Sequence, residues 1–196
     1  MKTITTVITS AFVLFAATAA NADTFLYRTD SKAGTTTESY AVMTPTLEVW
    51  AFSPKTNGAD LEVGRLYQVK SPKSTFLMVG GYYANWPNQK QSFAVPYLLA
   101  KATVGGVHLA GTLGTYVPLN GGPNIVFCDE ASATVNVDKK VQVGLATSFW
   151  TQDGSTTHRI GPKVHADLGG GYAIDLRALH GPSVPDTFRM ALTKSF

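Results

Sequence analysis

The stretch of sequence that decides the fold is TFRMALTKSF, residues 187–196 at the C-terminus. Apolar side chains stand at every second position of this stretch and polar or small side chains between them. The apolar set is Phe188, Met190, Leu192 and Phe196. Because successive side chains of a β-strand point to opposite faces, this alternation predicts a strand with one apolar face. Lys194 lies on that apolar face, where its long side chain can snorkel to a polar layer.

The two segments before this stretch alternate in the same way and carry the most charge. Apolar residues share one face over 157–168 and over 171–180. The other faces, together with that of the last strand, carry Arg159, Lys163, His165, Asp167, Asp175, Arg177 and Arg189. In a membrane barrel the apolar face meets lipid and this charged cluster faces the lumen, whereas a soluble sandwich would bury the apolar face. Alternation alone does not distinguish a membrane barrel from a soluble sandwich.

The rest of the chain reads as further strands. They are expected near 39–52, 59–70, 74–86, 91–102, 106–118, 131–138, 140–150, 157–168, 171–180 and 186–196. This predicts an all-β, antiparallel up-and-down transmembrane β-barrel of about ten strands over 39–196, with eight or twelve as alternatives. Residues 23–38 form a tail, a lumen plug or an extra strand pair, and the strand pair would make twelve.

The apolar run from Phe93 to Leu119 contains one charged residue, Lys101, and could be mistaken for a transmembrane helix. Pro96 would kink or break such a helix, and several glycines would weaken it. A hairpin that turns near Gly105 accounts for these residues better.

The N-terminus indicates export. Lys2 is followed by an uncharged run with an apolar centre, and Ala20 and Ala22 form a small-x-small cleavage site, so residues 1–22 are expected to be a signal peptide. Charged residues make up 15% of the chain, against about 25% in soluble domains, and there is no basic run. The composition therefore suits a protein in lipid and argues against a nucleic-acid partner. Cys128 is alone, so no internal disulfide can form.

The connections between the expected strands alternate in length. Longer polar ones are expected at 53–58, 87–91, 119–130, 151–156 and 181–185, and short turns lie between them. Outer-membrane barrels have short periplasmic turns and longer outer loops. Trp50, Trp86, Trp150 and Tyr116 fall at the longer-loop ends, where aromatic rings favour the headgroup layer. The chain is therefore expected in the outer membrane, in contact with its lipids.

The C-terminal stretch also resembles the last strand of bacterial outer-membrane β-barrel proteins. In that class a terminal Phe closes an alternating apolar strand, and here Phe188, Met190, Leu192 and Phe196 match. The resemblance implies that the barrel-assembly machinery is a partner and reads this strand. Lys194 departs from the pattern, since that place is often aromatic. No subfamily is assigned.

These features lead to a non-enzymatic outer-membrane barrel, either structural or a narrow passage for small solutes. The charged cluster is then a structural ion-pair network or a basic, pore-lining constriction that selects anions. One alternative is a lipid-modifying enzyme, in which His158 would act with Ser148 or Ser155 near the outer rim. A second is a soluble exported barrel or sandwich that binds an apolar ligand. No catalytic residue, metal site or cofactor is expected, because no histidines stand at metal-ligand spacing.

Overall fold

The computed structural model describes residues 24–44, 47–52, 60–69, 75–86 and 90–196. These residues form twelve β-strands, and the expected signal peptide lies outside them. The strands are β1 (Thr24–Lys32), β2 (Thr35–Met43), β3 (Leu47–Phe52), β4 (Asp60–Val69), β5 (Thr75–Trp86), β6 (Gln91–Val104), β7 (Val107–Pro118), β8 (Ile125–Asn136), β9 (Val141–Gln152), β10 (Ser155–Gly169), β11 (Tyr172–Gly181) and β12 (Val184–Ser195). No helix among the described residues has the length and apolar character needed to cross a bilayer.

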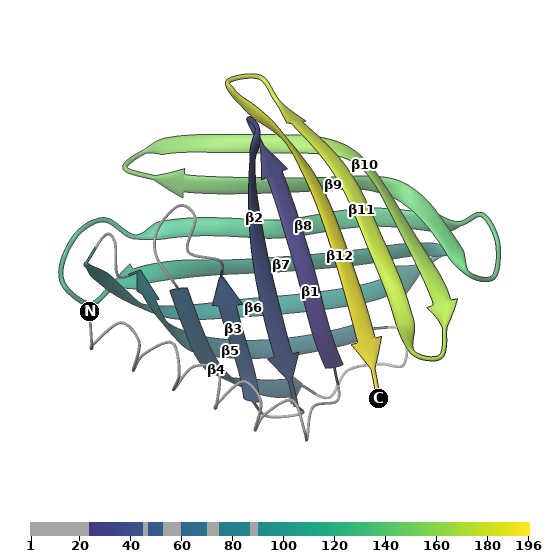
Figure 1. Cartoon of the computed structure of the whole chain (residues 1–196), viewed down its shortest axis with the longest axis horizontal. Helices are drawn as coiled ribbons and strands as arrows, with labels where there is room; N and C mark the ends of the chain where they lie inside the picture. Colours follow the sequence, from purple (N-terminus) through teal and green to yellow (C-terminus); the bar gives the residue numbers. More distant parts are fainter. Residues whose placement is uncertain (1–23, 45–46, 53–59, 70–74, 87–89) are drawn as a thin grey trace.

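Every strand pairs antiparallel with its neighbours in sequence, and the last pairs with the first. The closing seam between β1 and β12 runs from Thr24 opposite Ser195 to Lys32 opposite Thr187. The start of β1 and the end of β12 therefore lie at one rim, the terminal rim, and the β1–β2 and β11–β12 hairpins turn at the opposite rim (Figure 1). The predicted all-β up-and-down barrel is confirmed, with the alternative count of twelve in place of ten.

The two additional strands come from the N-terminal part of the chain. Residues 24–38 form β1 and the first part of β2, so the barrel starts at Thr24 and not at residue 39. The single strand expected over 39–52 is two strands, β2 and β3. They are joined where the Thr44 N–H donates to the Leu47 carbonyl at 2.8 Å. Of the three alternatives expected for residues 23–38, a tail, a lumen plug or an extra strand pair, the structure has the extra strand pair.

A β-bulge explains why β8 was expected too late in the chain. The register shifts between Cys128 and Ala131, and both Asp129 and Glu130 reach ion-pair partners inside the barrel. Before the bulge odd-numbered residues face inward, and after it even-numbered residues do. The alternation is thus interrupted in the middle of the strand, and the loop expected over 119–130 ends at Asn124.

The expected difference in loop length between the rims is only partly present. The loop expected over 53–58 and most of that over 87–91 lie outside the described residues, and two residues, not a longer loop over 181–185, join β11 to β12. Asp153 and Gly154, with φ of 50° and 75°, make a two-residue turn at the opposite rim, so the longer loop expected over 151–156 is wrong. Thr151 and Thr156 are instead register partners in β9 and β10. Left-handed conformations at both central positions are typical of hairpin turns that follow the strand twist.

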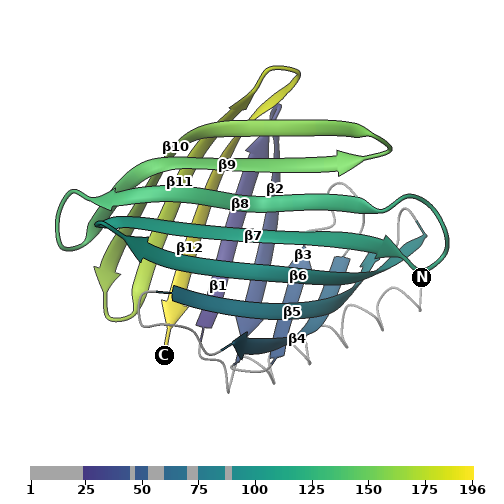
Figure 2. The same cartoon turned by 180° about the vertical axis from the view of Figure 1, so that it is seen from behind.

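The two faces of the sheet differ in chemistry. Large apolar side chains are exposed on the outside, and they share one face of their strands by register. They include Val79, Leu98, Leu109, Leu113, Leu145, Ile160, Val164, Leu168 and Phe188. Such an outward apolar belt is typical of a barrel that meets lipid. In Figure 1 the wall formed by β1, β2, β11 and β12 crosses in front of the wall formed by β5–β9. In Figure 2, which is seen from behind, the wall formed by β5–β9 is in front.

Candidate functional site in the barrel lumen

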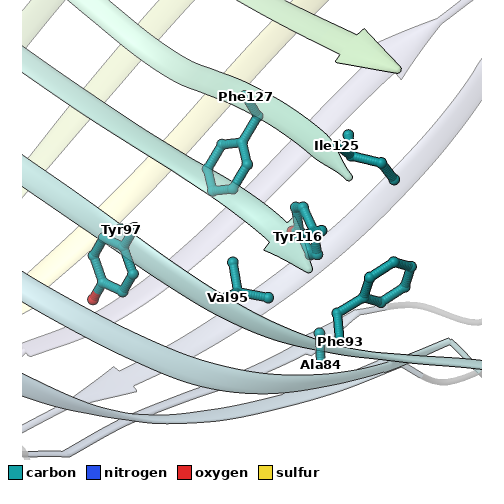
Figure 3. Close-up of a cluster of buried hydrophobic side chains, with 7 residues drawn as sticks. All are labelled: Ala84, Phe93, Val95, Tyr97, Tyr116, Ile125 and Phe127. Carbon is teal, nitrogen blue, oxygen red and sulfur yellow. The ribbon is translucent and has the colours of Figure 1, made fainter. Parts of the chain in front are cut away.

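An aromatic cluster occupies the inner side of β5–β9. Its members are Tyr82, Trp86, Phe93, Tyr97, Tyr116, Phe127 and Trp150, and Ala84, Val95 and Ile125 pack among them. Figure 3 shows the buried part of this cluster, which is Ala84, Phe93, Val95, Tyr97, Tyr116, Ile125 and Phe127. The ring centroids of Trp86 and Trp150 lie 6.4 Å apart, although β6, β7 and β8 separate their strands. Tyr116 lies between them, at 5.1 Å from Trp86 and 5.5 Å from Trp150. Rings of such distant strands meet only across the interior, so the cluster fills this side of the lumen.

These contacts correct the expected place of the tryptophans. The rings of Trp86, Trp150 and Tyr116 do not point outward, where lipid headgroups would be, because they pack against one another inside the barrel. Trp50 also faces inward, with the Arg28 guanidinium 5.5 Å from its ring centroid. Both faces of β5–β9 carry apolar residues, so the sequence pattern did not reveal which face these rings occupy.

Two inward glycines make room for the rings. A Cβ atom at Gly80 would lie 2.3 Å from Cζ of Tyr97, and one at Gly114 would lie 2.5 Å from Cζ of Phe127. Each ring therefore lies against the wall where a neighbouring strand has no side chain. The glycines are a packing device for the aromatic cluster, since no other residue leaves this space empty.

The other side of the lumen is charged, and its first group of ion pairs spans the interior. Arg28 of β1 and Arg189 of β12 both reach Asp129 of β8, with Nη1 atoms 3.1 Å and 3.0 Å from its carboxylate oxygens. Asp30 pairs with both arginines and lies 3.1 Å from Nε of Arg28. Because β8 lies on the wall opposite the seam, this group, the arginine bridge, crosses the lumen.

A second group of ion pairs links β8 to β10 and β11. Glu130 pairs with Lys163 and with Arg177, and Lys163 also lies 3.2 Å from Asp175. His165 Nδ1 lies 3.3 Å from the other oxygen of Asp175. Each carboxylate of this group thus faces at least one cation, as charges withdrawn from water require.

The structure brings together five of the seven residues of the expected charged cluster, Lys163, His165, Asp175, Arg177 and Arg189, in these ion pairs. Asp167 instead accepts a hydrogen bond from the Gly169 N–H at 2.8 Å, and Arg159 donates to the Pro185 carbonyl at 3.2 Å. Sequence reasoning missed four members: Arg28, Asp30, Asp129 and Glu130. For the first two the signal was present, because Arg28, Asp30 and Lys32 stand at alternate positions of one strand.

A cavity of about 430 Å³ opens between the charged side and the opposite rim. Inward residues of six strands and the β1–β2 turn line it: Asp30, Lys32, Ala33, Thr35, Thr37, Ser148, Arg159, Leu179, Thr187 and Arg189. Asp30 is paired with Arg189, whereas neither Lys32 nor Arg159 has a carboxylate partner among the described residues. The cavity therefore carries an excess of positive charge.

The expected enzyme residues do not meet. His158 Nε2 lies 2.7 Å from Oγ1 of Thr147 on the outer face, whereas the register puts Ser148 and Ser155 on the inner face. Oγ1 of Thr147 in turn donates to the Arg159 carbonyl at 2.9 Å, which is a structural hydrogen bond. Within the described part of the chain, no three His, Cys, Asp or Glu side chains are grouped as metal ligands would be.

At the terminal rim the C-terminal strand ends in an exposed group. Phe196 is 78% exposed there, whereas Phe188, which is half exposed on the outer face, lies near the opposite rim as the register partner of Ser31. The Lys194 ammonium donates to the Gly170 carbonyl and lies 4.3 Å from the Tyr172 ring centroid. Lys194 thus remains on the apolar face through a carbonyl and an aromatic partner.

Solved structures of outer-membrane barrels are similar to this one. The KdgM porin in complex with disordered oligogalacturonate has a TM-score of 0.67 at 13% identity, covering 88% of this chain and 99% of that one. The NanC porin has a TM-score of 0.63 at 7% identity, covering 88% and 100%. The outer membrane protein Omp33 of Acinetobacter baumannii has a TM-score of 0.52 at 11% identity, covering 91% and 100%.

No protein-family model matches the sequence, and no curated protein is a significant match to it. Identities this low establish the fold alone. The closed antiparallel topology, the outward apolar belt and these neighbours agree with the resemblance seen in the C-terminal strand. The chain has the fold of the bacterial outer-membrane β-barrel proteins, and porins are among its structural neighbours.

Proposed function

We propose that this chain is an outer-membrane barrel that provides a narrow passage for small anionic solutes. The outward apolar belt supports a position in lipid, since a soluble barrel would not expose so many large apolar side chains. The terminal rim would face the periplasm and the cavity would open outside the cell. The exposed Phe196 would be read by the barrel-assembly machinery during insertion.

The observation that carries the proposal is the cavity at the opposite rim. Lys32 and Arg159 line it without carboxylate partners among the residues described, so their charges are available to a solute. Unpaired cations in a confined space of low dielectric raise the local concentration of anions. A volume of about 430 Å³ accommodates a small organic anion such as a sugar acid.

The aromatic cluster makes the passage narrow. Phe93, Tyr116 and Phe127 are buried against their neighbours, so the inner side of β5–β9 is closed by side chains. A solute would then pass on the charged side, from the cavity past the arginine bridge to the terminal rim. The KdgM porin, whose structure was solved with oligogalacturonate, suggests galacturonate as an anionic probe.

The first test is whether the chain is a folded membrane barrel. Outer-membrane fractions are run on a detergent gel with and without heating, and a folded barrel is expected to migrate differently until it is heated. A soluble band with no shift would contradict the position in lipid. The purified protein is then placed in a planar bilayer, and the current is recorded under a KCl gradient.

The bilayer experiment tests the solute class. Wild type is expected to conduct with a reversal potential that favours chloride, and the double variant Lys32→Gln, Arg159→Gln is expected to lose most of this preference. Lys139→Gln removes a cation from an exposed turn at the terminal rim and serves as the control, with little expected change. An insulating wild-type protein would refute the passage and leave a structural barrel. An unchanged preference in the double variant would refute the role of the cavity.

A further inference from the structure

Two arginines of the lumen converge on one carboxylate. Arg28 and Arg189 come from the two strands of the closing seam, and Nη1 of each lies within hydrogen-bond distance of Asp129, at 3.1 Å and 3.0 Å. The Nη1 atom of Arg189 is also 3.0 Å from the second carboxylate oxygen. Two guanidinium groups aimed at one point form a clamp that fits any carboxylate, because their N–H groups match its two oxygens.

Asp30 holds the clamp from the other side. Its Oδ2 lies 3.1 Å from Nε of Arg28, and its Oδ1 accepts a hydrogen bond from Nε of Arg189. Asp30 is the register partner of Arg189, so this contact belongs to the seam itself. Asp30 thus holds Arg189 by a hydrogen bond and Arg28 by an ion pair without hydrogen-bond geometry, and both Nη1 atoms are directed at the position that Asp129 occupies.

Asp129 is more exposed than the two arginines of the clamp. It is the extra residue of the β8 bulge and has no register partner in β7 or in β9. Its side chain is 41% exposed, whereas those of Arg28 and Arg189 are 16% and 12% exposed. A bulged residue lies where the ladder is disrupted, so its side chain can move without breaking the sheet.

From these contacts we propose that Arg28 and Arg189 form a binding site for the carboxylate of a small solute, and that Asp129 occupies this site while no solute is bound. The inference rests on the proposed function and gives it a site, since Asp30 and Arg189 also line the cavity. A solute carboxylate replaces the Asp129 carboxylate one for one. The arginines stay paired throughout, and the exchange keeps binding weak enough for release, as passage requires.

The test measures binding, not current. Galacturonate is titrated into the detergent-solubilised full-length barrel by calorimetry, with galactose as the neutral counterpart. Asp129→Asn removes the competing charge with little change in shape, and it is expected to bind galacturonate about tenfold more tightly than wild type, equivalent to about 1.4 kcal/mol. Adding Arg189→Lys to this variant is expected to abolish the gain, because the ammonium group lacks the guanidinium fork.

Asp167→Asn is the matched control. It removes another inward carboxylate, one whose described contact is the Gly169 N–H and not the clamp. An equal gain in Asp167→Asn would overturn the proposal, since any loss of negative charge in the lumen would then suffice. An unchanged or weaker affinity in Asp129→Asn, or tighter binding of galactose as well, would overturn it too. Heat-dependent gel migration confirms that each variant is folded.

The outcomes separate this inference from the proposed function. An insulating barrel whose Asp129→Asn variant binds galacturonate tightly would keep the clamp and refute the passage. A barrel that conducts anions while Asp129→Asn shows no gain in affinity would keep the passage and refute the clamp.

Discussion

The two sides of the lumen belong to one sheet and differ in how they fill the barrel. On β5–β9 the inward residues are aromatic, with Phe93 and Tyr116 buried among other rings. On β1 and β10–β12 the inward residues are charged and meet carboxylates that reach over from β8. One side thus resembles the core of a soluble protein, and the other is an ion-pair network whose charges are mostly withdrawn from water. The comparison shows that being inward in a barrel does not require a residue to be polar.

The difference also divides the work of the barrel. Rings that interdigitate exclude water and fix the shape of the wall. Ion pairs leave room for water and can exchange partners, so they suit a path for solutes. We expect substitutions on the aromatic side to change stability and the width of the passage together, and those on the charged side to change stability and ion preference.

The largest effect is expected from Tyr116→Ala. Its ring lies 5.1–6.3 Å from those of its aromatic neighbours, so truncation leaves a hole in the cluster. The free energy of unfolding is expected to fall by about 3–5 kcal/mol, as it does when buried aromatic residues in general are truncated. The single-channel conductance is expected to rise. Unfolding by guanidinium chloride in lipid vesicles and bilayer recordings measure the two. Tyr83→Ala, on the exposed outer face, is the control, and unchanged conductance in Tyr116→Ala would show that the cluster does not border the passage.

Glu130→Ala tests the charged side. It leaves Lys163 and Arg177 without their shared carboxylate, and a partly buried cation without its partner is costly. We expect the free energy of unfolding, measured in the same experiment, to fall by about 3 kcal/mol. Glu130→Gln keeps hydrogen-bonding oxygen and nitrogen atoms at this place and should lose less. If Glu130→Ala unfolds like wild type, Asp175 and water compensate these cations, and the Glu130 ion pairs are not structural.

Gly80→Ala sharpens the picture of the aromatic side. Its new Cβ would overlap the Tyr97 ring, so the ring must move toward the lumen, and a loss of about 2 kcal/mol is expected from overpacking. Gly81→Ala is matched in chemistry and neighbouring in sequence, but its Cβ would meet only the Val95 carbonyl oxygen, at 4.0 Å. Equal stability of the two variants would show that Tyr97 does not depend on the glycine for its position.

The smallest effect is expected from Asp186→Ala. Asp186 lies 2.6 Å from Nδ1 of His180, and both side chains are 74% exposed outside the lumen. Exposed ion pairs contribute less than about 1 kcal/mol, so its unfolding free energy should stay close to that of wild type. If Asp186→Ala lowered the unfolding free energy as much as Glu130→Ala does, enclosure in the lumen would not explain why the Glu130 ion pairs stabilise the barrel.

Much of the fold could be predicted because alternation is local. In β10–β12 one face is charged and the other apolar, so period two was plain in the sequence. Prediction failed where the alternation was interrupted or weak. The bulge at Asp129 and Glu130 changes the inward parity within β8, and β1 and β2 have too few large apolar residues to stand out.

The sequence by itself determined that the chain forms antiparallel strands, and that the last three strands have one apolar and one charged face. Only the tertiary structure decided which charges meet. Arg189 and Asp30 are 159 residues apart in sequence, and Arg28 and Asp129 are 101 apart. Such pairs form only when the barrel closes, and no local pattern encodes their distance. The inward place of Trp50, Trp86 and Trp150 was decided in the same way, because both faces of their strands carry apolar residues and only packing across the lumen distinguishes them.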